Sequence, residues 1–153
     1  MMSEYPDKLQ SIIDELALIE DSQDRMEFLI DYADKFEEVP ENIARRPFPP
    51  ETKVPFCESE AYVFAVQNDD GTIKYYYAVD NPNGVSAKAL AQIFSSTVNN
   101  LKPEDIEKIP LDVIYKIFGQ SLSMGKNMGL TGILQMMKRD AKKFMSKEAQ
   151  LKN

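Results

Sequence analysis

The 153-residue chain has no histidine, no tryptophan and a single cysteine, Cys57. Without histidine it lacks the side chain that most often acts as a general base or metal ligand near neutral pH. One cysteine excludes an intramolecular disulfide, a thioredoxin-type dithiol and a zinc site made of cysteine and histidine. These absences exclude the cysteine–histidine hydrolases and leave one side chain with soft nucleophilic chemistry.

The chain also lacks a long apolar segment. Its longest apolar run, residues 61–66, is far shorter than the ~20 residues that span a bilayer. The first residues contain neither the basic part nor the apolar part of a signal peptide. We therefore expect a cytoplasmic protein that does not associate with a membrane.

Acidic residues outnumber basic ones, with 25 Asp and Glu against 18 Lys and Arg, so the formal net charge is −7. Binding along a nucleic-acid backbone requires many cations that neutralise phosphates, so nucleic acid is not an expected partner. A protein partner that carries a basic patch is expected instead.

The length and an ordinary composition, with 43% hydrophobic and 28% charged residues, predict a single globular domain with its own core. We expect this core to occupy about residues 7–145, with a mobile tail at 146–153. Apolar residues recur at helical spacing at both ends of the chain. The expected helices cover residues 6–20, 21–39 (capped by Asp21), 86–101 (capped by Ser86), a short stretch from 103, 110–119 (ended by Gly119), and a last segment after a turn at 123–129.

Alternating polarity predicts strands at residues 59–67 and 72–79, and the Asn-Asp-Asp-Gly turn at 68–71 joins them into a hairpin. Residues 53–56 are a candidate short third strand. The sequence thus predicts an α+β fold in which a small antiparallel sheet of about three strands packs against helices.

Cys57 follows a connector with five prolines between residues 40 and 55, which we expect to be extended. A lone cysteine is most often a small buried apolar residue. Here the proline connector precedes the cysteine, and the charged residues Glu58 and Glu60 follow it. This context favours a loop at the edge of the sheet, where reactive thiols are found.

The thiol has few chemical options. A hydrolase needs a base beside the nucleophile, and the chain has no histidine for a cysteine–histidine pair. A thiol peroxidase needs an activated thiolate, which the adjacent carboxylate of Glu58 disfavours. Attack on a sulfur atom that a partner has already activated needs only a small thiolate fraction. Thiol–disulfide exchange and persulfide transfer both satisfy this condition, so the residues favour a sulfur carrier or a redox adduct.

Three segments resemble the SufE family, in order and over roughly residues 7–145. Residues 54–62 (VPFCESEAY) are similar to the active loop of the family, V-x-G-C-Q-S-x-V-W. Residues 24–30 (DRMEFLI), with the proline connector at 40–50, are similar to its second-helix signature. Residues 122–130 (LSMGKNMGL) are similar to L-S-x-x-R-x-x-G-L, which opens the last helix.

The resemblance implies a function. SufE proteins accept sulfane sulfur from the persulfide of a cysteine desulfurase that carries pyridoxal phosphate, stimulate that enzyme, and deliver the sulfur to an iron–sulfur scaffold. Cys57 matches the sulfur acceptor. The resemblance thus implies a sulfur carrier rather than an enzyme, with no metal site or cofactor of its own. Two alternatives stay open: an adaptor that binds a desulfurase without carrying sulfur, and a thiol peroxidase.

Several neighbours are candidates for supporting roles. Phe56 stands where the family commonly has glycine, and it would cover the persulfide and affect how freely the loop moves. Lys126 stands where the family has arginine, and its charge would attract the persulfide or stabilise the thiolate. Ser59 is expected to be a turn residue that can hydrogen bond to the loop backbone. The expected partner-binding residues are Arg45, Arg46 and Glu58.

Overall fold

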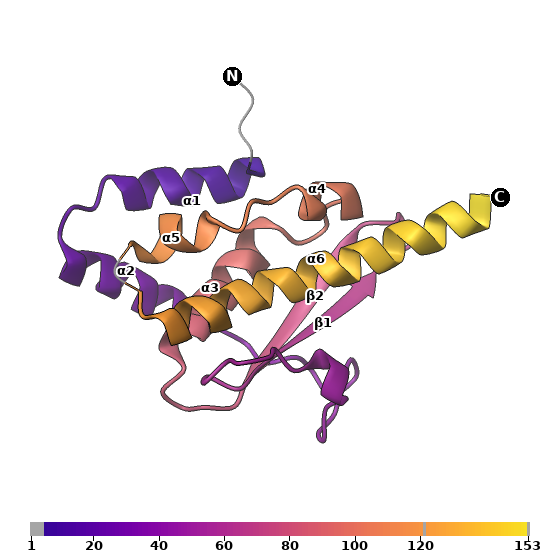
Figure 1. Ribbon diagram of the computed structural model, residues 1–153, viewed down its shortest axis with the longest axis horizontal. Coiled ribbons are helices and arrows are strands. Elements are labelled where there is room, and N and C mark those ends of the chain that lie inside the picture. Colours follow the sequence, from indigo (N-terminus) through magenta and orange to yellow (C-terminus); the bar gives the residue numbers. More distant parts are fainter. Residues whose placement is uncertain (1–4, 121, 153) are drawn as a thin grey trace.

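The computed structural model describes residues 5–120 and 122–152, and this part of the chain contains six α-helices and a two-stranded antiparallel sheet (Figure 1). The predicted α+β fold is therefore confirmed. In chain order the elements are α1 (Asp7–Ala17), α2 (Ser22–Asp34), the 3₁₀ turn η1 (Pro50–Thr52), β1 (Ala61–Gln67), β2 (Ile73–Val79), α3 (Val85–Thr97), α4 (Pro103–Glu107), α5 (Val113–Phe118) and α6 (Met124–Lys152).

Local signals account for several helix ends. The Asp21 carboxylate caps α2 by accepting hydrogen bonds from the backbone N–H groups of Gln23 and Asp24, at 2.8 and 3.1 Å. Pro103 lies in the first turn of α4, where its missing N–H costs nothing. Gly119 ends α5 with φ of 88°, a left-handed conformation that glycine adopts without a steric penalty.

Two predicted details of the helix starts are wrong, namely the cap at Ser86 and the turn at residues 123–129. Ser86 does not cap α3, because Gly84 is the N-cap residue and the helix already begins at Val85. The expected turn at residues 123–129 lies mostly inside α6, which begins at Met124. The Ser123 hydroxyl accepts a hydrogen bond from the backbone N–H of Lys126 at 3.2 Å, as a helix cap does. The helix then continues through residues 146–152, which were predicted to be a tail.

The third strand is also absent from the described sheet, which consists of β1 and β2 alone. Residues 53–56 contribute one isolated bridge, between Lys53 and Tyr62. Pro55 has no N–H to donate, and Phe56 adopts a left-handed backbone conformation. The segment therefore cannot continue the ladder of hydrogen bonds with β1.

The hairpin has an apolar surface on both faces. Alternate residues of β2 are buried against the helices, as predicted, and they are Ile73, Tyr75, Tyr77 and Val79. On the other face Phe48 of the proline connector packs its ring against Tyr62 and Phe64 of β1, with ring centres 5.0 Å apart in both pairs. The connector therefore belongs to the domain and covers the outer face of the sheet.

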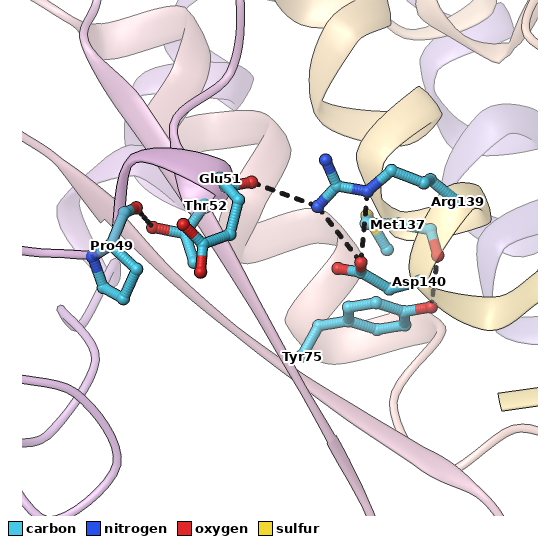
Figure 2. Close-up of polar contacts among 7 residues, drawn as sticks. All are labelled: Pro49, Glu51, Thr52, Tyr75, Met137, Arg139 and Asp140. Carbon is cyan, nitrogen blue, oxygen red and sulfur yellow. Dashed lines mark hydrogen bonds and ion pairs between the residues drawn. The ribbon is translucent and has the colours of Figure 1, made fainter. Parts of the chain in front are cut away.

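Helix α6 is the longest element and runs past both strands (Figure 1). Its apolar stripe is buried in the main core and consists of Leu130, Ile133, Leu134, Met137 and Ala141. Figure 2 shows two further attachments: the Tyr75 hydroxyl donates to the Met137 carbonyl at 2.7 Å, and Arg139 donates to the Glu51 carbonyl at 3.1 Å. Burial raises the pKa of Tyr75, so its hydroxyl remains a donor. Strand β2 and the connector are thus both tied to α6.

None of the helices in residues 5–120 and 122–152 combines the length and apolar character that crossing a bilayer requires.

Arg25 of α2 joins two other helix ends. Its guanidinium donates to the Leu16 carbonyl near the end of α1 and to the Ile117 carbonyl near the end of α5, both at 2.9 Å. Carbonyls in the last turn of a helix need such partners, and the Leu16 carbonyl also accepts a hydrogen bond from the Ile19 N–H at 3.1 Å. We expect Arg25→Ala to lower the free energy of unfolding by about 2 kcal/mol, the usual contribution of hydrogen bonds to a charged donor.

Urea denaturation followed by circular dichroism measures this loss. The matched control is Arg45→Ala, which removes an exposed arginine and should change the free energy of unfolding by less than about 0.5 kcal/mol. Equal losses in the two variants would contradict the bridging role of Arg25.

Candidate functional site

Cys57 lies on a tight loop between η1 and β1. The loop is closed by a hydrogen bond from the Val54 N–H to the Ala61 carbonyl at 2.8 Å and another from the Glu60 N–H to the Cys57 carbonyl at 3.0 Å. Phe56 and Glu60 have φ of 57° and 53°, which is the left-handed region. Each such residue other than glycine costs about 1 kcal/mol or more, so the loop around the cysteine is strained.

Two glycines of α6 let this loop approach the helix. A Cβ atom on Gly129 would lie 3.2 Å from both the Cα and the Sγ of Cys57. One on Gly132 would lie 2.8 Å from Cγ1 of the buried residue Val54. The backbone of the cysteine therefore packs directly against the helix, and the thiol is partly buried at this contact.

A cavity of about 300 Å³ opens beside the thiol. Its walls come from the cysteine loop, from the turn between β2 and α3, and from the first turns of α6. The side chains that argue for a function here are Cys57, Glu58, Ser59, Asn81 and Lys126. The structure therefore brings Cys57 together with three of its predicted neighbours, Glu58, Ser59 and Lys126.

The turn after β2 holds the part of the cysteine loop that follows Cys57. The Asn81 N–H donates to the Ser59 carbonyl, and the Asn81 side-chain amide donates to the Glu58 carbonyl, both at 3.1 Å. Ser59 thus contributes its backbone carbonyl to the loop. A Cβ atom on Gly84 would lie 3.1 Å from that of Ser59, so glycine is needed at this wall too.

Three of these residues, Asn81, Gly84 and Gly129, were not predicted as parts of the site. The Asn-Pro-Asn-Gly run at 81–84 indicated a turn, but nothing local indicated that this turn meets residues 58–59. The glycine of the L-S-x-x-R-x-x-G-L segment, which is Gly129 here, was the available signal for the close contact with α6.

Phe56 lies on the other side of the loop. It is 79% exposed and is not among the residues that line the cavity of Cys57. With Met128 and Thr131 it lines a second cavity of about 540 Å³ along α6. Phe56 therefore does not cover the free thiol in this structure, and its expected cover of the persulfide stays a prediction.

The two predicted docking arginines differ from each other. Arg46 donates two hydrogen bonds to the Glu38 carboxylate, at 2.7 and 2.9 Å, pairs with Asp80, and lies over the Phe48 ring. The Arg46 guanidinium holds the pKa of Glu38 below its usual value. Arg45 is exposed, and neither arginine lines the cavity of Cys57. Arg46 thus already has partners within the chain.

The site can support nucleophilic sulfur chemistry. It offers one thiol and one lysine that line the same small cavity, and the chain has no histidine to act as a base. No three side chains of the His, Cys, Asp and Glu types gather as a metal site within the described ranges. A thiolate in this setting can attack an activated sulfur atom and hold the product.

Comparisons with known proteins identify a family and a shared fold. The family model described as "SufE: Fe-S metabolism associated domain" matches residues 10–141. A solved structure, the solution structure of a hypothetical protein from Thermus thermophilus, is similar to this chain with a TM-score of 0.72. The alignment covers 93% of this chain and 98% of that one at 20% identity, which shows the same fold. No match was found among curated proteins.

The contact at Gly129 predicts opposite effects for two glycine substitutions in α6. We expect Gly129→Ala to push the loop away from the helix, to cost about 1–3 kcal/mol of stability through overpacking, and to speed the reaction of Cys57 with Ellman's reagent. Gly125→Ala is the matched control, because its Cβ atom would lie at an ordinary 3.5 Å from Glu58 Oε1. Alanine there should stabilise the helix by up to about 1 kcal/mol.

Ellman kinetics and urea denaturation on both variants test this prediction. If the thiol in Gly129→Ala reacted no faster than in Gly125→Ala, the helix contact would not control the position of Cys57.

Proposed function

This chain belongs to the SufE family, and from that premise we propose that it accepts persulfide sulfur on Cys57 from a cysteine desulfurase, stimulates that enzyme, and passes the sulfur on for iron–sulfur cluster assembly. Membership of the family associates the chain with iron–sulfur metabolism. The observation that supports the finer proposal is the placement of the only cysteine: partly buried, on a strained loop, in a small cavity beside Lys126.

The transfer is a single exchange at sulfur. The Cys57 thiolate attacks the terminal sulfur of the partner's persulfide, a new S–S bond forms on Cys57, and the original S–S bond breaks. The partner's cysteine leaves as a thiolate and takes up the proton that Cys57 released. No external oxidant or reductant is needed, because the sulfane sulfur moves without a change in its oxidation state. Pyridoxal phosphate would belong to the partner, which generates the persulfide.

The residues around the thiol have distinct roles in this proposal. Lys126, at the wall of the cavity, would attract the anionic persulfide and stabilise the negative charge on sulfur. The cavity, at about 300 Å³, has space for the additional sulfur atom. Arg45 and Glu58 are exposed and would contact the partner, whereas Arg46 would first have to leave Glu38 and Asp80.

Phe56 supports a docking role for the same loop. An exposed aromatic ring on a left-handed residue is costly in the free protein, both in strain and in apolar surface left in water. Met124 and Met128 of α6 are also exposed, at 80% and 46%. We define these three side chains as the apolar rim, and we propose that the desulfurase buries it when Cys57 enters the partner. An adaptor that carries no sulfur would use the same rim.

The carrier proposal predicts a covalent adduct. After incubation with an active desulfurase and cysteine, without reductant, intact mass spectrometry should show an increase of one sulfur atom, about 32 Da. The increase should disappear on addition of a thiol reductant and should be absent from Cys57→Ser.

The same experiment separates the carrier from the adaptor. A carrier loses its stimulation of the desulfurase in Cys57→Ser, whereas an adaptor keeps it. An adduct on Cys57→Ser, or full stimulation by that variant, would refute the carrier proposal.

The apolar rim predicts a loss of docking affinity. Phe56→Ala should raise the concentration that gives half-maximal stimulation of the desulfurase by about tenfold, since burying an aromatic ring contributes roughly 1.5–3 kcal/mol. Phe56→Gly should weaken docking similarly while stabilising the free protein by about 1 kcal/mol, because glycine tolerates the left-handed conformation.

Leu18→Ala is the matched control, because Leu18 is comparably exposed, at 84%, and follows α1. It should leave the half-maximal concentration unchanged. An equal effect of Leu18→Ala, or no effect of Phe56→Ala, would rule out Phe56 as an anchor.

A further inference from the structure

Helix α6 is positively charged in a protein that is otherwise strongly negative. Within Met124–Lys152 the sequence has seven Lys and Arg residues and two acidic residues, so the helix carries +5. The rest of the chain has the remaining 11 basic and 23 acidic residues, or −12. The negative end of the helix dipole favours cations only in the last turn of a helix. Most of these lysines lie earlier in α6, so the dipole does not account for them.

Five of the cations line one groove. This groove, which we call the basic groove, has a volume of about 720 Å³ and lies between α6 and the segment that contains the end of α4 and Leu111. The cationic side chains along it are Lys138, Arg139, Lys142, Lys143 and Lys147.

Intramolecular contacts use only some of this charge. Lys142 pairs with Glu107 at 3.4 Å, Arg139 pairs with Asp140 at 3.1 Å, and the Lys138 ammonium donates to the Ile109 carbonyl at 2.7 Å. Among the residues that the structure describes, neither Lys143 nor Lys147 has an ion-pair partner. Glu107 in the lining and Asp140 beside Arg139 offset two of the five cations, which leaves a net charge of +3 at the groove.

The groove also offers apolar surface. Leu111 is 38% exposed at its wall, and the aliphatic stems of the lysines extend the apolar surface beneath their charged ends. A ligand that fits this surface therefore needs carboxylates at intervals along its length and apolar side chains beside them. A nucleic-acid strand fits less well, because its affinity depends on many phosphate contacts while the rest of this chain repels phosphate.

We propose that the basic groove binds an acidic, amphipathic segment of a protein partner. Carboxylates of that segment form ion pairs with Lys143 and Lys147, and one of its apolar side chains packs on Leu111. This site shares no lining residue with the cavity of Cys57. It does share Gln135 and Arg139 with the cavity beside Phe56, so a bound segment can extend along α6 towards the apolar rim. The expectation of a basic partner, drawn from the net charge, thus does not apply to this face.

A synthetic peptide tests the inference directly. The probe is a fluorescein-labelled peptide of about four helical turns, with glutamate on one face and leucine on the other, and its binding to the full chain is followed by anisotropy. We expect binding that weakens when salt is raised from about 50 to 300 mM, and that weakens at least about fivefold in the Lys143→Gln, Lys147→Gln double variant.

Two protein controls give the result its specificity. The Lys8→Gln, Lys116→Gln double variant removes the same charge from exposed positions on α1 and α5 and should bind the peptide like the unmodified chain. Cys57→Ser should also bind normally, because the groove is separate from the thiol. Circular dichroism checks that both double variants are folded.

Several outcomes would overturn the inference. One is equal weakening in the two double variants, and another is equal binding of a peptide with glutamine in place of glutamate. Tighter binding of a single-stranded DNA oligomer of matched charge would assign the groove to nucleic acid instead. Since none of these tests uses a desulfurase or measures sulfur, failure of this inference and failure of the sulfur-carrier proposal are distinguishable.

Discussion

The close approach of the cysteine loop to α6 is the contact on which the site depends. Gly129 and Gly132 lie about one helical turn apart, and at both positions any side chain would meet the loop. This absence of side chains lets Val54 enter the core and lets Cys57 rest against the helix. The same helix buries its apolar stripe against the sheet, so the position of the thiol is coupled to the packing of the whole domain.

The loop combines firm attachment with stored strain. Hydrogen bonds to Ala61 and Asn81 hold its two arms, whereas Phe56 and Glu60 adopt backbone conformations that are unfavourable for their side chains. Strain of this kind persists only where the surrounding structure imposes it, and it concentrates at functional segments. A thiol that must be sheltered at rest and then enter a partner would benefit from such a loop, since leaving the resting conformation releases part of that strain.

Charge is distributed in a way that the net value conceals. A chain with a net charge of −7 suggests a uniformly acidic surface, but α6 concentrates cations along one groove while acidic residues occupy the rest of the chain. Local potential, rather than total charge, determines what a surface attracts. Arg46 illustrates the converse: its charge is visible in the sequence, but Glu38 and Asp80 already pair with it.

Local rules were enough to predict the hairpin, the cap at Asp21, the end of α5 at Gly119 and the loop position of Cys57, because each follows from neighbours in the sequence. Tertiary contacts decided the rest. The glycines at 125 and 129 suggested a turn, yet they are helical because the stripe from Leu130 onward is buried and the loop needs the lack of a side chain at 129. The third strand failed because Pro55 and Phe56 cannot continue a ladder. The walls around the thiol and the basic groove join residues far apart in the chain, and such long-range contacts have no signature in local patterns.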